Sequence, residues 1–235
     1  MADKIYLQVC AGLANRLRAT VSGLCAAEDL SKNIIISWPT EHAFGANWND
    51  IFEPESWITT TPIAYSRMCL SPADWKKEKQ NSSIVIKSYG QFYPSSDRWL
   101  LVLRSFKPKE YYLDRVKELF GDIKPVGVHI RRTDNLRSIL NSPTTSFFDA
   151  MDRMPDRIFF VATDDQNEYT AMVARYPGRI IERKPILRRD TLEGIQDAFL
   201  DFLALSRCTE IIGSAGSSFS EIAAAYGSIP IQIIQ

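Results

Sequence analysis

The first 38 residues alternate between an apolar strand, an amphipathic helix and a second apolar strand. Lys4–Cys10 is a β-rich run that Gly12 interrupts. Asn15–Ser31 then carries apolar residues at helical spacing, and Asn33–Trp38 is apolar again. A strand, helix and strand in succession form a βαβ unit, which joins parallel strands by a right-handed crossover. The sequence therefore predicts a parallel sheet covered by helices.

The rest of the chain repeats this alternation after one irregular stretch. Residues 39–75 are rich in Pro, Trp, Asn and Ser and predict loop-rich structure, whereas residues 107–124 form a charged amphipathic segment. Further strands are predicted at Ser83–Ser88, Val126–Arg131, Arg157–Ala162, Arg179–Glu182, Glu210–Gly213 and Pro230–Ile234. Further helices are predicted at Thr145–Met154, Asn167–Tyr176, Leu192–Cys208 and Ser218–Tyr226.

A break at Gly121 and Pro125 predicts a junction between two domains, residues 1–122 and 123–235. Strands and helices alternate in both halves. The predicted fold is therefore α/β, with two Rossmann-like lobes, parallel sheets and a ligand cleft between the lobes. Ligands of open parallel sheets bind at the carboxyl ends of the strands, so the residues that follow the strands are the candidates for a site.

Composition excludes several classes of function. Lys plus Arg and Asp plus Glu both number 28, so no overall charge attracts nucleic acid or a membrane, and any anion site is local. The two histidines exclude a His-rich metal site. No apolar run reaches the roughly 20 residues of a membrane-spanning helix, and the first residues do not resemble a signal peptide. We therefore expect a cytoplasmic or otherwise soluble protein.

The turn after the first strand is a candidate for phosphate binding. Gly12 is expected to let the backbone turn tightly, and the N-terminus of the helix that follows offers free N–H groups near Asn15 and Arg16. Neither a Walker loop nor the GxGxxG fingerprint is present. A plain strand-to-helix turn with an arginine on the surface is an equally good interpretation of this turn alone.

The run from His129 to Asp134 follows a buried strand and contains two adjacent arginines. Guanidinium groups match phosphate oxygens in geometry, so a diphosphate is a natural ligand. Alternation along the strand places His129 and Arg131 on one face and Arg132 on the other. One arginine then reaches a ligand while the other pairs internally, for example with Asp134. The alternative is an internal ion-pair network without a ligand.

Two further strand ends carry polar residues. Asp164 and Asp165 are adjacent, and neighbouring side chains on a strand diverge, which argues against a shared metal ion. We expect one to cap the next helix and the other to hydrogen-bond a base or ribose, the alternative being that both cap. Near the end of the chain, Ser218 and Glu221 have the spacing of a capping box, which predicts a helix start suited to a phosphate.

These motifs, in this order, resemble those of the fucosyltransferase superfamily, which includes α1,6-fucosyltransferases, the rhizobial nodulation fucosyltransferase and protein O-fucosyltransferases. The resemblance spans about residues 5–227. The matching segments are Gly12–Arg16, the His-x-Arg-Arg-x-Asp motif at His129–Asp134, Ala162–Asp165 and Ser217–Ser220. Trp38 and Asn49–Phe52 resemble the aromatic segment after the second strand of the family.

The resemblance implies a GT-B-like fold and an inverting glycosyltransferase that transfers fucose or a related sugar from a GDP-sugar to a glycan or other hydroxyl acceptor. It implies no metal and no cofactor beyond the donor itself. The first lobe would be the acceptor side and the second would bind the GDP-sugar. Arg131 would hold the β-phosphate and, with His129, act in catalysis. The other implied donor-binding residues are Gly12, Asn15, Arg16, Arg132, Asp134, Asp164, Asp165, Ser217, Ser218 and Phe219.

The sequence departs from the family in two respects. Some relatives carry a glutamate after the arginine motif as the proposed catalytic base, but Asn135–Leu140 contains no carboxylate. Glu41, Asp50 and Glu53 are the candidates for the base instead. The chain is also short, so we expect a small or exposed acceptor, such as a glycan end or a lipid-linked sugar. The alternative function is a non-catalytic module that binds a sugar nucleotide or glycan, and a third is a plain scaffold.

Overall fold

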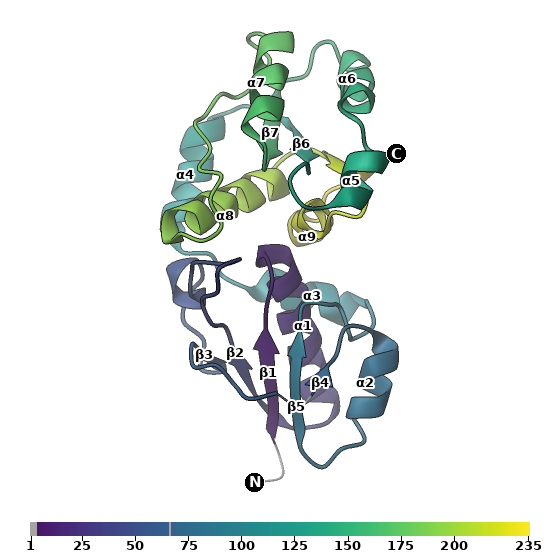
Figure 1. The fold of residues 1–235 in the computed structure, drawn as a ribbon. Coiled ribbons are helices and arrows are strands. Elements are labelled where there is room, and N and C mark those ends of the chain that lie inside the picture. The colour runs from purple at the N-terminus through teal and green to yellow at the C-terminus, as the bar shows by residue number, and fades with distance from the viewer. Residues whose placement is uncertain (1–3, 66) are drawn as a thin grey trace. The chain divides into compact units, whose positions relative to one another are not determined.

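The computed structural model describes residues 4–65 and 67–235. The chain divides into two compact units. The first contains the described residues up to Lys109 together with Arg188–Gln196, and the second contains Glu110–Leu187 and Asp197–Gln235. Each unit has its own parallel sheet with helices packed on it (Figure 1), which confirms the predicted α/β class.

The sheet of the first unit has the strand order β3-β2-β1-β5-β4, and all of its pairs are parallel. Its centre is β1, where Ile5, Leu7 and Val9 are buried. The bounds of the strands are Lys4–Val9 for β1, Asn33–Ser37 for β2, Ile58–Thr59 for β3, Arg67–Met68 for β4 and Ile84–Ser88 for β5.

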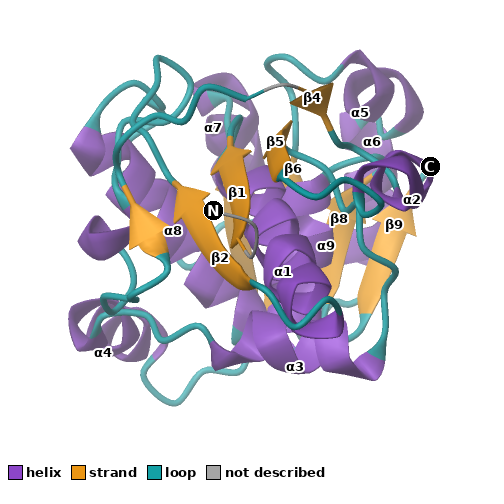
Figure 2. Cartoon of the chain, turned by 90° about the horizontal axis from the view of Figure 1, so that it is seen from below, coloured by secondary structure: helices purple, strands orange, loops and turns teal. Residues whose placement is uncertain are grey.

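Helix α1 packs against β1, β2 and α3, and Figure 2 shows α1 and α3 together. A Cβ at Gly23 would lie 2.6 Å from Leu7 Cδ2, so the missing side chain lets α1 approach the sheet closely. The helices of this unit are α1 at Leu13–Asp29, the 3₁₀ helix η1 at Trp48–Asp50, α2 at Pro72–Glu78 and α3 at Asp97–Ser105. Residues 39–65 and 67–71 are mainly irregular, as predicted, but the predicted loop-rich stretch ran to residue 75, whereas α2 begins at Pro72. An aromatic cluster around the buried Trp48 lies within the irregular stretch.

The sheet of the second unit has the strand order β7-β6-β8-β9 and is also parallel. Strands β6, β7 and β8 are buried along their whole length. The bounds are Val126–Ile130 for β6, Phe159–Thr163 for β7, Ile211–Ser214 for β8 and Ile231–Ile234 for β9.

The predicted strand at Arg179–Glu182 is wrong. This segment makes a single bridge, between Ile180 and Phe159. The chain then turns away because the backbone N–H of Arg183 donates to Tyr169 Oη at 2.8 Å, and its guanidinium pairs with Asp197 on the next helix. These contacts remove the segment from the edge of the sheet after one pair of ladder hydrogen bonds.

Six helices cover the second sheet or continue into this unit, counted within the described residues. They are α4 at Glu110–Phe120, α5 at Leu136–Asn141, α6 at Thr144–Asp152, α7 at Gln166–Arg175, α8 at Leu192–Ser206 and α9 at Ser218–Gly227. Helix α4 packs by its aromatic side chains, with Tyr112 against Phe199 and Phe120 against Phe160. In the described part of the chain, every helix is too short or too polar to cross a membrane.

Candidate functional site

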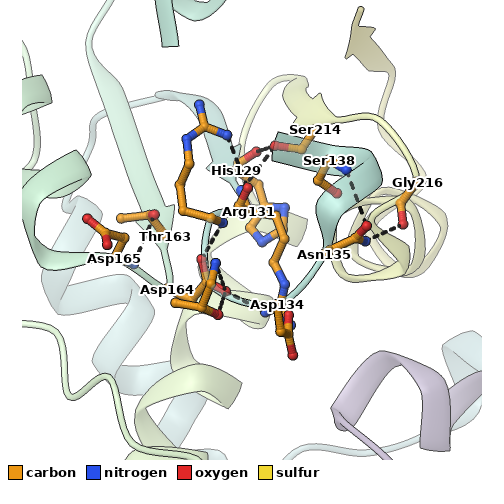
Figure 3. A network of polar contacts seen from close by, with 12 residues as sticks. His129, Arg131, Asp134, Asn135, Ser138, Thr163, Asp164, Asp165, Ser214 and Gly216 are labelled. Carbon is orange, nitrogen blue, oxygen red and sulfur yellow. Dashed lines mark hydrogen bonds and ion pairs between the residues drawn. The ribbon is translucent and has the colours of Figure 1, made fainter. Parts of the chain in front are cut away.

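The carboxyl ends of β6 and β8 lie side by side in the second unit and are bonded to each other. The register pairs His129 with Gly213. The buried hydroxyl of Ser214 then accepts the backbone N–H of Arg131 at 3.0 Å and contacts the carbonyl oxygen of His129 at 3.4 Å. Figure 3 shows these residues at the centre of a polar network. The turn that carries the arginines is therefore fixed to the turn that opens α9.

His129 is only 5% exposed, and its ring stacks on Phe219 with ring centroids 5.0 Å apart. Burial, reinforced by the positive charge of Arg131, lowers the pKa of His129 to about 3. The imidazole is therefore neutral at pH 7. Its Nδ1 atom is buried and has no hydrogen-bond partner among the described residues. An unpaired polar atom in a buried position is costly, which makes Nδ1 a candidate to bind a ligand.

The guanidinium of Arg131 pairs with two carboxylates. It contacts Asp134, and its NH1 atom lies 2.9 Å from Oδ2 of Asp164. Asp164 also accepts the backbone N–H of Arg132 at 2.7 Å and the hydroxyl of Thr133 at 2.5 Å. Burial alone raises the pKa of Asp164, but Arg131 and these hydrogen bonds outweigh it and hold the pKa below its ordinary value. Asp164 is therefore a carboxylate that fixes the arginine turn.

Arg132 also pairs inside the unit. Its NH2 atom lies 3.3 Å from Oε1 of Glu168 and 3.1 Å from the hydroxyl of Thr144, and its guanidinium lies 5.7 Å from the ring centre of Phe147. The sequence predicted an internal partner for one arginine of the motif, but the structure shows carboxylate partners for both. Arg131 is the more accessible of the two, with 21% of its side chain exposed against 12% for Arg132.

Asp165 caps the next helix, which is the role expected for one of the two aspartates. Its Oδ1 atom accepts the backbone N–H of Glu168 at 2.9 Å at the start of α7. In Figure 3 the carboxylate of Asp165 points away from Asp164 and Arg131. The structure therefore brings Asp164, and not Asp165, together with the arginine.

Helix α9 begins at Ser218, as predicted, but its N-cap lies one residue before the expected one. The N-cap is Ser217, so the expected capping box of Ser218 and Glu221 is wrong, and Ser218 is the first helical residue. The cause is Gly216, whose φ of 68° turns the chain in the left-handed region. The side chain of Ser217 makes no capping hydrogen bond. The N-terminus of α9 is thus left without a side-chain cap, as an anion site requires.

Three polar residues that the sequence did not reveal support this turn. Asn135 donates to the carbonyl of Gly216 at 3.0 Å, and Ser138 donates to that of Ala215 at 2.8 Å. Ser142 accepts the backbone N–H of Ala215 at 2.8 Å. Asn135 is also the N-cap of α5, and the preference of asparagine for helix starts is the signal that could have indicated it.

In the first unit, the turn before α1 differs from the prediction. Gly12 is the N-cap of α1 with a φ of −72°, which any residue adopts, and Ala11 takes the left-handed φ of 66°. The expected role of Gly12 in turning the backbone is therefore wrong. A Cβ at Gly12 would meet nothing within 4 Å, so the position is open. Asn15 lies half-buried on the first turn of α1.

Arg16 is completely buried and binds the turn from inside. It donates to the carbonyl oxygens of Ala11 and Pro39, both at 2.8 Å, and its guanidinium lies 4.5 Å from the ring centre of Phe44. Burial lowers the pKa of Arg16 to about 10, although the charge of Glu41 opposes this effect. The surface arginine that one interpretation of the sequence expected is not what the structure shows.

The three candidate bases all lie in the first unit. Glu41 is 30% exposed and lies 3.6 Å from the guanidinium of Arg16. Asp50 accepts the backbone N–H of Asn47 at 2.6 Å, and Glu53 is exposed. Within residues 4–65 and 67–235, no group of three or more His, Cys, Asp or Glu side chains is arranged to hold a metal ion.

No protein-family model and no curated protein matches the sequence. Solved structures do match the fold. NodZ α-1,6-fucosyltransferase co-crystallized with GDP matches at a TM-score of 0.72 and 16% identity, over 95% of this chain and 92% of that one. A NodZ fucosyltransferase from Bradyrhizobium matches at a TM-score of 0.71 and 16% identity, over 95% and 91% of the two chains. POFUT1 in complex with GDP-fucose matches at a TM-score of 0.63 and 11% identity, over 99% and 98% of the two chains. The chain therefore has the GT-B-like α/β fold of these fucosyltransferases.

Proposed function

We propose that this protein is an inverting, metal-independent glycosyltransferase that moves fucose, or a related sugar, from a GDP-sugar to a hydroxyl group of a glycan or other acceptor. The observation that carries the proposal is the pairing of two anion-binding features at adjacent strand ends. Arg131 follows β6, the N-terminus of α9 follows β8, and Ser214 bonds the two turns together.

This arrangement suits a diphosphate that leaves during the reaction. Negative charge builds on the diphosphate as the glycosidic bond breaks, and fixed positive groups stabilise that charge most when they are already in place. Arg131 supplies a guanidinium held by two carboxylates, and α9 supplies backbone N–H groups and the positive end of its dipole. A guanidinium in this position does the work that a divalent ion does in metal-dependent transferases.

The neighbouring residues then have distinct roles. The Nδ1 atom of neutral His129 forms a hydrogen bond with an oxygen atom of the GDP-sugar, and stacking on Phe219 fixes the plane of the imidazole ring. Ser217 and Ser218 offer hydroxyl groups at the start of α9. Asp164 acts as a positioning residue for the guanidinium of Arg131. In the same proposal the second unit binds the GDP-sugar.

The solved structures support the nucleotide assignment. NodZ was crystallized with GDP and soaked with GDP-fucose, and POFUT1 was crystallized with GDP and with GDP-fucose. The segments that resemble the fucosyltransferase motifs in sequence are, in the second unit, the ones that meet at the ends of β6, β7 and β8.

A thermal-shift panel tests the donor assignment, with GDP, GDP-fucose, GDP-mannose, UDP and ADP measured with and without Mg²⁺. A ligand at a hundred times its dissociation constant adds about 2.7 kcal/mol to the free energy of unfolding. We expect the guanosine compounds to stabilise the protein without metal, and Arg131→Ala to abolish this effect. Arg131→Lys, which keeps the positive charge but loses the planar guanidinium, should retain part of the GDP stabilisation.

Arg175→Ala is the matched control. Arg175 also pairs with an aspartate, Asp152, but it lies at the C-terminal end of α7, away from the strand ends. This variant should keep the full GDP effect. Equal stabilisation by UDP, a strict need for Mg²⁺, or no shift with any nucleotide would contradict the donor assignment.

One observation favours the alternative of a non-catalytic sugar-nucleotide module. The candidate bases Glu41 and Asp50 are both engaged in contacts within the first unit, and Asn135–Leu140 offers no carboxylate. Release of GDP from GDP-fucose in the presence of an acceptor panel separates the two functions, with the anomer of the product read by NMR. Tight GDP-fucose binding with no turnover across the panel would favour the binding module.

A further inference from the structure

Three arginines lie between the end of β6 and the end of α5, and the third has no partner among the described residues. Arg131 and Arg132 are both paired with carboxylates. Arg137, on α5, is exposed and forms no hydrogen bond or ion pair with any residue that the structure describes. An unpaired guanidinium three residues after the end of a proposed phosphate-binding motif is available to an external anion.

Arg137 lines a hollow of about 530 Å³ on the surface of the second unit. A volume of this size falls in the range of small-molecule sites, about 300–1,000 Å³. None of the side chains that line the hollow is acidic. The lining residues that bear on the argument are Leu140, Asn141, Pro143, Ser146 and Ala215.

The hollow adjoins the turn that opens α9. Ala215 belongs to both, and the side chain of Arg137 lies against Gly216, with its Cδ atom 3.0 Å from the place of a Cβ there. Ser138, the residue after Arg137, donates to the carbonyl of Ala215 at 2.8 Å. Helix α5 is therefore bonded to the proposed phosphate-binding turn, and this contact fixes the backbone position of Arg137.

The chemistry of the lining suits a sugar that bears a negative charge. Asn141 and Ser146 offer donors and acceptors for sugar hydroxyl groups, and Leu140 and Pro143 offer apolar surface for a pyranose face. Arg137 offers a planar fork that matches either a carboxylate or a phosphate. Because the net charge of the chain is zero, this attraction is local to the hollow.

We propose that this hollow is an acceptor subsite in which Arg137 binds an anionic group, a carboxylate or a phosphate, on the acceptor sugar. The proposal rests on the transferase function proposed above. It assigns Arg137 to acceptor selection and leaves the donor to Arg131 and α9.

Titrations with three small probes test the proposal by NMR or calorimetry. They are glucuronate, glucose 1-phosphate and neutral glucose, which separate a carboxylate from a phosphate and both from an uncharged sugar. We expect at least one anionic probe to bind about tenfold tighter than glucose, the effect of one charge-assisted hydrogen bond. Arg137→Gln should remove this preference, and Arg137→Lys should keep part of it. Arg153→Gln, which removes an exposed arginine after α6, is the control and should change nothing.

Equal binding of anionic and neutral probes, or a preference that survives Arg137→Gln, would overturn the proposal. The GDP thermal shift is measured on the same variants. Arg137→Gln should keep it, and its loss would assign Arg137 to the donor and also overturn the proposal. Absence of any GDP shift in the unaltered protein is a different result, which would reject the proposed transferase function while the sugar titration still decides whether Arg137 forms an anion site.

Discussion

Burial keeps the imidazole of His129 neutral at pH 7, and this limits what the residue does in a reaction. A histidine with a pKa of about 3 is a weak general base, because a good base has a pKa near the working pH. It does serve as a neutral hydrogen-bond partner, and its buried Nδ1 atom has no partner among the described residues. In the proposed reaction, the proton of the acceptor hydroxyl would therefore go to another group.

The same pKa makes stability depend on pH in a direction that is readily tested. The unfolded chain binds a proton on His129 below about pH 6.5, whereas the folded protein does not until pH falls to about 3. The stability from His129 is therefore fully present above pH 6.5 and is lost as pH falls below it. Between pH 7.5 and 5, we expect this residue to cost about 2 kcal/mol of the free energy of unfolding.

Urea unfolding of the unaltered protein and of His129→Gln at both pH values measures this effect, because glutamine does not titrate. Asp201 changes the stability in the opposite direction as pH falls, since burial raises its pKa to about 7 in spite of Arg183. Both proteins contain Asp201, so its effect cancels in the comparison. The difference between the two pH dependences isolates His129. An identical loss of stability in both proteins would show that His129 is not held neutral.

Residue identities were easier to predict than residue partners. The sequence pointed to His129, Arg131 and Asp164, and the structure brings these three together. It did not reveal that Arg132 pairs with Glu168, because that contact depends on the parallel register of β6 and β7 and on the start of α7, 36 residues further along the chain. Long-range pairs of this kind come from packing, which a strand or helix pattern does not encode.

At the scale of elements, the longest helices were predicted well and the shortest elements were missed. The long helices α1 and α8 and the buried strand β6 lie within a few residues of their predicted bounds. Helix α5 was missed because it is six residues long and its apolar residues are exposed, with Leu140 at 77%. Strands β3 and β4, of two residues each, are too short to show a pattern.

The N-cap of helix α7 allows a test of whether Asp165 only caps the helix or also contacts the nucleotide. Asp165 caps α7 through Glu168, so Asp165→Ala should lower the free energy of unfolding by about 1 kcal/mol. Asp165→Asn, which keeps the accepting oxygen, should change it little. Both variants should keep the GDP thermal shift, measured in the same experiment. Loss of the shift in Asp165→Ala with little change in stability would show instead that Asp165 contacts the nucleotide.

At the scale of the whole molecule, the two units are built from interleaved segments of the chain. The chain passes between them at Lys109, at Leu187 and at Gln196. Helix α8 is continuous, although its first residues belong to the first unit and the rest to the second. The sequence predicted a single junction, since a break in pattern marks where an element ends but does not reveal which unit a returning segment joins.

Gly45 is where the returning segment 188–196 meets the first unit. The backbone N–H of Gly45 donates to the carbonyl of Arg189 at 2.9 Å. A Cβ at Gly45 would lie 2.7 Å from the backbone carbonyl of Asp190, a distance shorter than Cβ contacts in real structures. Because the carbonyl belongs to the backbone, it cannot move aside as the end of a flexible side chain can. We therefore expect Gly45→Ala to displace the segment and to destabilise the protein by about 1–3 kcal/mol, the usual cost of overpacking.

Gly12→Ala is the control for this prediction. At Gly12 the φ is −72° and a Cβ would meet nothing within 4 Å, so the poorer cap and the stiffer unfolded chain should nearly cancel, within about 0.5 kcal/mol. All five tryptophans lie in the first unit, so their fluorescence reports on that unit while far-UV circular dichroism reports on both. In Gly45→Ala we expect both urea midpoints to fall together, because α8 continues from the displaced segment into the second unit. A fall in fluorescence alone would show that the two units unfold independently, and no fall in either would show that the segment does not contribute to the stability of the first unit.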